Sequence, residues 1–157
     1  MARAEPVTFD AVNERADWMV GASDEALVAE ASALADELLA MGEAVLERWL
    51  VAHGRKPTDG QVEGFRLLAL HRQAAKGAPS FNACRETCRE LVYHRNLVHH
   101  EPASPDVARR LRLGAMVARH LALFVGGKLE NSGLGEFCCS SKPLRRFETA
   151  QGEARHA

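Results

Sequence analysis

The segment from Cys84 to Pro102 holds the densest group of reactive side chains in the chain, in the order CRETCRELVYHRNLVHHEP. Histidine exchanges protons near neutral pH, and the guanidinium of arginine holds phosphate through paired hydrogen bonds. On a helix, Cys84, Cys88, Arg95 and His99 share one face, because their spacings of four, seven and four follow the helical period. These residue types predict either acid–base chemistry on a phosphate or the binding of a metal ion.

The string RNLVHHEP, from Arg95 to Pro102, resembles the signature of the HEPN superfamily, the higher eukaryote and prokaryote nucleotide-binding helical bundles. In that signature an arginine, usually followed by a small polar residue, precedes a histidine by a few positions, as Arg95, Asn96 and His100 do here. The ending His-His-Glu-Pro is similar to that of some abortive-infection members. The resemblance implies an RNA-binding protein or a metal-independent endoribonuclease, in which two motifs face each other across a homodimer.

Under this resemblance, Arg95 would clamp phosphate, Asn96 would orient backbone or substrate, and His100 or His99 would act as acid and base. Arg95 and His100 are separated by about 140° around a regular helix, so they converge only if the last turn distorts. His99 is better placed in an ideal helix. The structural alternative is that Arg95 and both histidines simply end a helix, where cations interact favourably with the helix dipole.

The same segment also offers metal ligands. Cys84 and Cys88 lie one helical turn apart, and further ligands could come from the histidines or from the vicinal cysteines near the C-terminus. The alternative hypothesis is therefore a non-enzymatic bundle that binds a transition metal or haem through Cys84, Cys88, His94, Cys138 and Cys139. Against it, free cysteines are often small buried hydrophobes on packed helices. The RNA hypothesis requires no cofactor.

Two other histidines, His71 and His120, lie on neighbouring expected helices, from which they could approach this centre. Each lies beside an arginine, Arg72 or Arg119, and we expect both histidines to be partly exposed. The tail beyond residue 134 combines two phenylalanines with basic residues. That pattern suits either a packed extension or an arm that stacks on single-stranded nucleic acid.

The composition is typical of a soluble globular domain, with 46% hydrophobic and 26% charged residues. The longest strongly apolar stretch, Leu113–Val125, is interrupted by Arg119 and His120 and is shorter than the roughly 20 residues of a bilayer span. The first residues show no export signal, so we expect a cytoplasmic protein with reduced cysteines and no membrane contact.

Charge is distributed unevenly along the chain. Residues 1–60 hold 5 Lys and Arg against 12 Asp and Glu, whereas residues 61–128 hold 11 against 5. Residues 129–157 hold 4 of each kind. This asymmetry predicts either an acidic helix packed against basic ones or a basic face that meets a polyanion.

Glycine and proline cluster at the edges of periodic segments, which predicts an all-α fold. Thr8 is expected to cap a short N-terminal helix ending near Val20. Four longer helices are then expected in an up-and-down bundle. Their expected extents are Ser23 to His53, Thr58 or Asp59 to Gly77, Ser80 to His100, and Ser104 to Leu129. Residues 1–130 would form one domain, and residues 131–157 an irregular, partly disordered extension.

These observations predict a HEPN-like helical module that binds or cleaves RNA and self-associates as a homodimer. The metal- or haem-binding bundle is one alternative. A regulatory subunit that binds a protein partner through its charged halves is the other.

Overall fold

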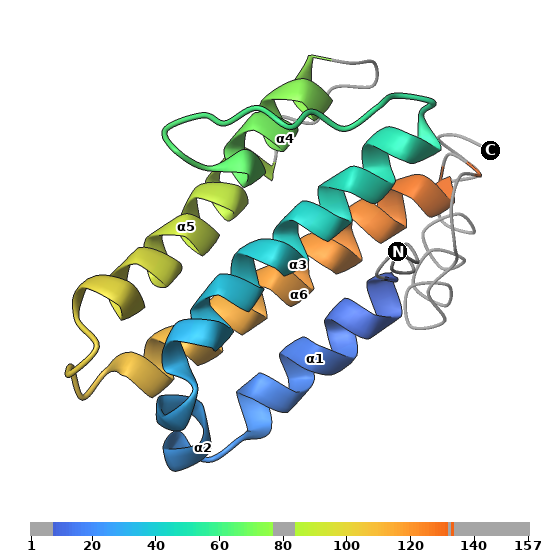
Figure 1. Ribbon diagram of the computed structural model, residues 1–157. Helices are drawn as coiled ribbons and strands as arrows, with labels where there is room; N and C mark the ends of the chain where they lie inside the picture. The colour runs from blue at the N-terminus through green and yellow to red at the C-terminus, as the bar shows by residue number, and fades with distance from the viewer. Residues whose placement is uncertain (1–7, 77–83, 132, 134–157) are drawn as a thin grey trace, which may run out of the picture.

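The computed structural model describes residues 8–76, 84–131 and 133, and these residues form a helical bundle (Figure 1). The helices are α1 Phe9–Gly21, α2 Asp24–Ala29, α3 Ala31–Ala52, α4 Arg66–Ala75, α5 Arg85–His100 and α6 Val107–Asn131. The described ranges contain no β-strand, so the predicted all-α class is confirmed. None of the helices combines the length and the apolar character that crossing a membrane requires, as far as the described residues extend.

Several helix ends lie where local chemistry predicts them. The hydroxyl of Thr8 accepts a hydrogen bond from the Ala11 amide at 3.0 Å and caps α1, which ends at Gly21. Helix α5 ends at His100, two residues before Pro102, because proline disfavours helical backbone in the residue that precedes it. The expected start of this helix at Ser80 lies outside the described residues, as do residues 134–157 of the expected C-terminal extension.

The expected single helix from Ser23 to His53 is wrong, because the chain breaks at Glu30 into α2 and α3. Glu30 has φ −124° and ψ 26°, outside the helical range. The break turns α2 toward α6, where Leu27 becomes fully buried. Arg112 of α6 donates to the Ala22 carbonyl oxygen at 2.7 Å and holds the start of α2 in place. The packing of α2 on α6 therefore outweighs the helical spacing of apolar residues that continues across Glu30.

The expected helix start at Thr58 or Asp59 is also wrong, because α4 begins at Arg66. Val62 and Phe65 exchange two backbone hydrogen bonds, at 3.0 and 2.9 Å, around Glu63 and Gly64. Both central residues have positive φ, 55° for Glu63 and 86° for Gly64. Such a pair forms a tight hairpin-type turn and is incompatible with a right-handed helix.

The segment of residues 55–65 is held against α3 and α4 by polar contacts. Arg66 donates to Glu47 on α3 at 2.7 Å and to the Thr58 carbonyl oxygen at 2.9 Å. The side-chain carbonyl of Gln73 on α4 accepts from the Thr58 amide at 2.8 Å. These contacts fix the tight turn, which in turn places Phe65 beside α5.

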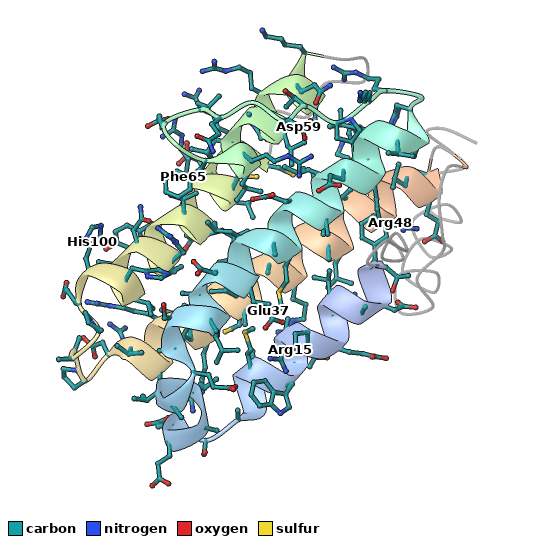
Figure 2. All side chains as sticks on the ribbon, in the orientation of Figure 1. Arg15, Glu37, Arg48, Asp59, Phe65 and His100 are labelled. Carbon is teal, nitrogen blue, oxygen red and sulfur yellow. The ribbon has the colours of Figure 1, made fainter. Side chains whose placement is uncertain are left out.

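Helix α6 packs against α1, α3 and α5, and it lies alongside α3 in Figure 1. Close packing depends on Gly114, where an added Cβ would lie 2.5 Å from Cδ1 of Leu38 and 3.5 Å from Cβ of His94. A residue without a side chain at this position therefore permits close contact between α6 and its neighbours α3 and α5. Arg15 of α1 and Glu37 of α3 point toward each other and form a two-pronged ion pair, at 2.6 and 3.1 Å (Figure 2).

Candidate functional site

Arg95 and His99 lie one turn apart on α5, and both contact the carboxylate of Asp36 on α3. The Nε of Arg95 donates to Oδ1 of Asp36 at 3.2 Å, and Nε2 of His99 lies 2.9 Å from the same oxygen. The side chains of Arg95 and His99 are 28% and 26% exposed, and that of Asp36 is 58% exposed. A molecule in solvent can therefore reach all three groups.

Two more contacts fix the orientation of Arg95. One terminal nitrogen of its guanidinium donates to Oδ1 of the neighbouring Asn96 at 3.0 Å. The guanidinium carbon lies 5.7 Å from the centre of the Phe65 ring, within the range of a cation–π contact. We call Asp36, Arg95, Asn96 and His99 the Asp36 cluster.

His100 does not join this cluster. Helix α5 stays regular through His100, so the last turn does not distort in the way that would bring His100 toward Arg95. Its side chain is exposed, and none of the residues that the structure describes forms a hydrogen bond or ion pair with it. Figure 2 shows Phe65 beside α5 and His100 nearer the C-terminal end of that helix.

Asp36 is the member of the cluster that sequence reasoning did not single out. The available signal was coarse: α3 belongs to the acidic first 60 residues, and α5 belongs to the basic middle of the chain. The Asp36 contacts with Arg95 and His99 are one place where these two halves meet. The charge asymmetry predicted an acidic helix against basic ones as one of two alternatives, but it did not indicate which carboxylate would be shared.

His94 points into the protein and away from the solvent-facing cluster. It is only 7% exposed, and its Nδ1 has no hydrogen-bond partner within the described part of the chain. Its Nε2 lies 3.8 Å from Oε1 of Glu90. Burial lowers the pKa of His94, and the nearby Glu90 opposes this effect without reversing it. The imidazole is therefore neutral at physiological pH.

Cys84 and Cys88 are buried in the core, with exposed fractions of 2% and 0%. Burial raises the pKa of both thiols, that of Cys84 to about 12. Both therefore stay protonated at neutral pH, whereas the thiolate is the form that binds metals. Cys84 and Cys88 therefore pack in the core as small hydrophobic residues.

Among the described residues, the predicted metal ligands Cys84, Cys88 and His94 do not form a metal site. Within residues 8–76, 84–131 and 133, no three His, Cys, Asp or Glu side chains gather in a group able to hold a metal ion. His94 is thus not joined to Cys84 and Cys88. Cys138 and Cys139 lie outside the described residues.

The expected partial exposure holds for one of the two remaining histidines. His120 is exposed on α6, and its ring stacks on Phe124 with the ring centres 6.4 Å apart. His71 is buried, with 7% exposure, so that expectation is wrong. The neighbouring Arg72 is exposed instead, because successive residues on a helix point about 100° apart.

Comparisons of the chain with protein-family models, with curated proteins and with solved structures find no match. The function proposed below therefore depends on the geometry of the Asp36 cluster and on the short motif that contains Arg95.

Proposed function

We propose that the chain is an RNA-binding or metal-independent RNA-cleaving module, built on an up-and-down helical bundle in which α3 and α5 pack against α6. One observation carries the proposal: a single carboxylate, Asp36, holds the guanidinium of Arg95 and the imidazole of His99 side by side at the surface. A fixed cation beside a fixed acid–base group is what phosphodiester chemistry requires.

Each member of the cluster has a distinct role in this proposal. Arg95 keeps N–H donors beyond those engaged by Asp36 and Asn96, and these bind the phosphate. His99 uses Nε2 to contact Asp36, which leaves Nδ1 to exchange a proton with the substrate. Asp36 and Asn96 are positioning residues, because they orient the two groups that touch RNA.

The proposed cleavage needs no metal ion. His99 takes the proton of a ribose 2′-hydroxyl, and the 2′-oxygen attacks the adjacent phosphorus while Arg95 stabilises the developing negative charge. The bond to the 5′-oxygen breaks, and that oxygen takes a proton from solvent or from the second motif of the proposed homodimer. The products are a 2′,3′-cyclic phosphate and a 5′-hydroxyl end.

The test is a cleavage and binding assay on end-labelled single-stranded RNA in the presence of EDTA. We expect His99→Ala to reduce cleavage by about 10²- to 10⁴-fold, the usual contribution of a general acid–base group. Arg95→Ala should weaken binding as well. His120→Ala removes an exposed histidine from α6 and serves as the matched control.

Three results would contradict the proposal. If wild-type protein neither binds nor cleaves RNA, the module has another function. If His100→Ala abolishes cleavage and His99→Ala does not, the assignment of the acid–base role to His99 is wrong. Activity that disappears with EDTA and returns with added metal would refute the metal-independent mechanism.

A further inference from the structure

A second feature lies away from the Asp36 cluster, between α4 and the first turns of α5. Here the surface is hollowed into a cleft of about 340 Å³. Four cationic side chains line it: Arg72 from α4, Lys76 just after the end of α4, and Arg85 and Arg89 from α5. None of the described residues that line the cleft carries a carboxylate.

Three of these four cations have no acidic partner among the residues that the structure describes. Arg89 pairs with Glu63 at 2.9 Å, at the tight turn beside the cleft. No carboxylate in the described ranges lies within ion-pair distance of Arg72, Lys76 or Arg85. By contrast, other arginines such as Arg15 and Arg66 pair with acidic residues. Within the described part of the chain, Arg72, Lys76 and Arg85 are therefore gathered at the cleft without a neutralising carboxylate.

The shape of the site strengthens its attraction for anions. Protein walls of low dielectric constant focus the field of like charges that line a cleft. The N-terminal end of α5 lies at the same cleft, because Arg85 is its first residue. Aligned peptide dipoles add positive potential at that end of a helix.

The cleft is not uniformly polar. Val62, Leu68 and Ala75 add apolar side chains to its lining. Pockets for small molecules typically enclose about 300–1,000 Å³, and this cleft falls at the lower end of that range. A ligand that fits combines an anionic group with a small apolar or planar body.

We propose that the α4/α5 cleft binds a phosphate monoester, with the phosphate held by Arg72, Lys76 and Arg85 and the organic part resting on Val62, Leu68 and Ala75. The same chemistry is present in a small phosphorylated metabolite and in the terminal phosphate of an RNA strand. The site uses none of the residues of the Asp36 cluster, so it does not depend on the proposed RNA cleavage.

The experiment is a calorimetric titration of the full chain at low ionic strength with three probes. Phenyl phosphate carries both the anion and a planar body, inorganic phosphate carries the anion alone, and phenol carries the ring alone. A 5′-phosphorylated ribo-oligonucleotide and its 5′-hydroxyl counterpart form the second arm. The variants are Arg85→Gln and the matched control Arg109→Gln, which removes an exposed arginine from α6.

We expect phenyl phosphate to bind more tightly than inorganic phosphate and phenol not to bind. Arg85→Gln should weaken binding about tenfold or more, as expected when one charge-assisted contact is removed, while Arg109→Gln leaves it within about twofold. Preference for the 5′-phosphorylated oligonucleotide, with the same loss in Arg85→Gln, would identify RNA ends as the source of the phosphate.

The proposal is overturned if no phosphorylated probe binds. It is also overturned if Arg85→Gln and Arg109→Gln weaken binding equally, because the attraction is then a property of the whole surface. Circular dichroism checks that Arg85→Gln keeps the fold. Arg72→Gln removes a second exposed cation of the same cleft and should weaken binding in the same way. Because these probes contain no cleavable phosphodiester, the result is distinct from the outcome of the RNA cleavage assay, apart from the oligonucleotide arm.

Discussion

Oδ1 of Asp36 lies 2.9 Å from Nε2 of His99, although 63 residues separate the two in the chain. The same oxygen accepts from Arg95, so a single carboxylate on α3 positions two different functional groups on α5. All three side chains are at least partly exposed. Exposed ion pairs stabilise proteins by only about 0–1 kcal/mol, so we expect these contacts to contribute little to the stability of the fold.

The substitution Asp36→Asn tests whether Asp36 positions His99 for catalysis or stabilises the fold. We expect RNA cleavage to fall about tenfold to a hundredfold, because the hydrogen bond that orients His99 loses its charged acceptor. The free energy of unfolding should change by less than about 1 kcal/mol. Cleavage rates and urea unfolding curves measure the two quantities. Asp10→Asn, an exposed aspartate at the start of α1, is the control. A loss of stability as large as the loss of activity would make Asp36 a structural residue.

Buried His94 makes stability depend on pH. Burial lowers its pKa in the folded protein, whereas the unfolded chain has the ordinary value near 6.5. Between these two values the unfolded state binds more protons, so stability is lost as the pH falls through this window. We expect the wild-type protein to lose more unfolding free energy than His94→Leu between about pH 8 and about pH 5, by about 1.4 kcal/mol for each unit of pKa difference.

Urea unfolding at the two pH values measures the effect of His94. His120→Leu removes an exposed histidine and should keep the wild-type pH dependence. Equal pH dependence in the wild-type protein and His94→Leu would show that His94 is not the group responsible.

Two glycines of α6 should respond differently to alanine. An added Cβ at Gly126 meets only ordinary contacts with Phe9, the nearest at 3.7 Å, so Gly126→Ala should stabilise the protein by about 0.5–1 kcal/mol. At Gly114 the same Cβ lies 2.5 Å from buried Leu38, and overpacking should offset that gain by about 1–3 kcal/mol. Thermal unfolding compares the variants. If they are equally stable, α3 and α6 are less tightly packed there than the structure indicates.

Cys84 and Cys88 should resist alkylation in the native protein. Raising the pKa of Cys84 from 9.0 to about 12 lowers its thiolate fraction about a thousandfold at neutral pH, and burial blocks access to both thiols. Iodoacetamide labelling followed by peptide mass spectrometry measures each cysteine, with urea-unfolded protein as the fully reactive reference. Native labelling of either residue as fast as in urea would show that it is an accessible, reactive thiol.

The sequence determined the features that depend on neighbouring residues. Apolar side chains at helical spacing, the Thr8 cap and the proline after Glu101 specified an all-α chain with α1, the end of α5 and α6. The motif around Arg95 placed an arginine and histidines on the last turns of one helix. Caps, periodicity and proline act within a few residues, and for that reason they can be read along the chain.

The tertiary structure decided which of these groups meet. It supplied Asp36 from a distant helix to contact both Arg95 and His99, and it gathered the cations of the α4/α5 cleft. It also broke the expected helix at Glu30 and formed the tight turn at Gly64. The direction in which each helix faces depends on apolar surface that is buried only when the whole bundle assembles, and a local sequence pattern does not encode that choice.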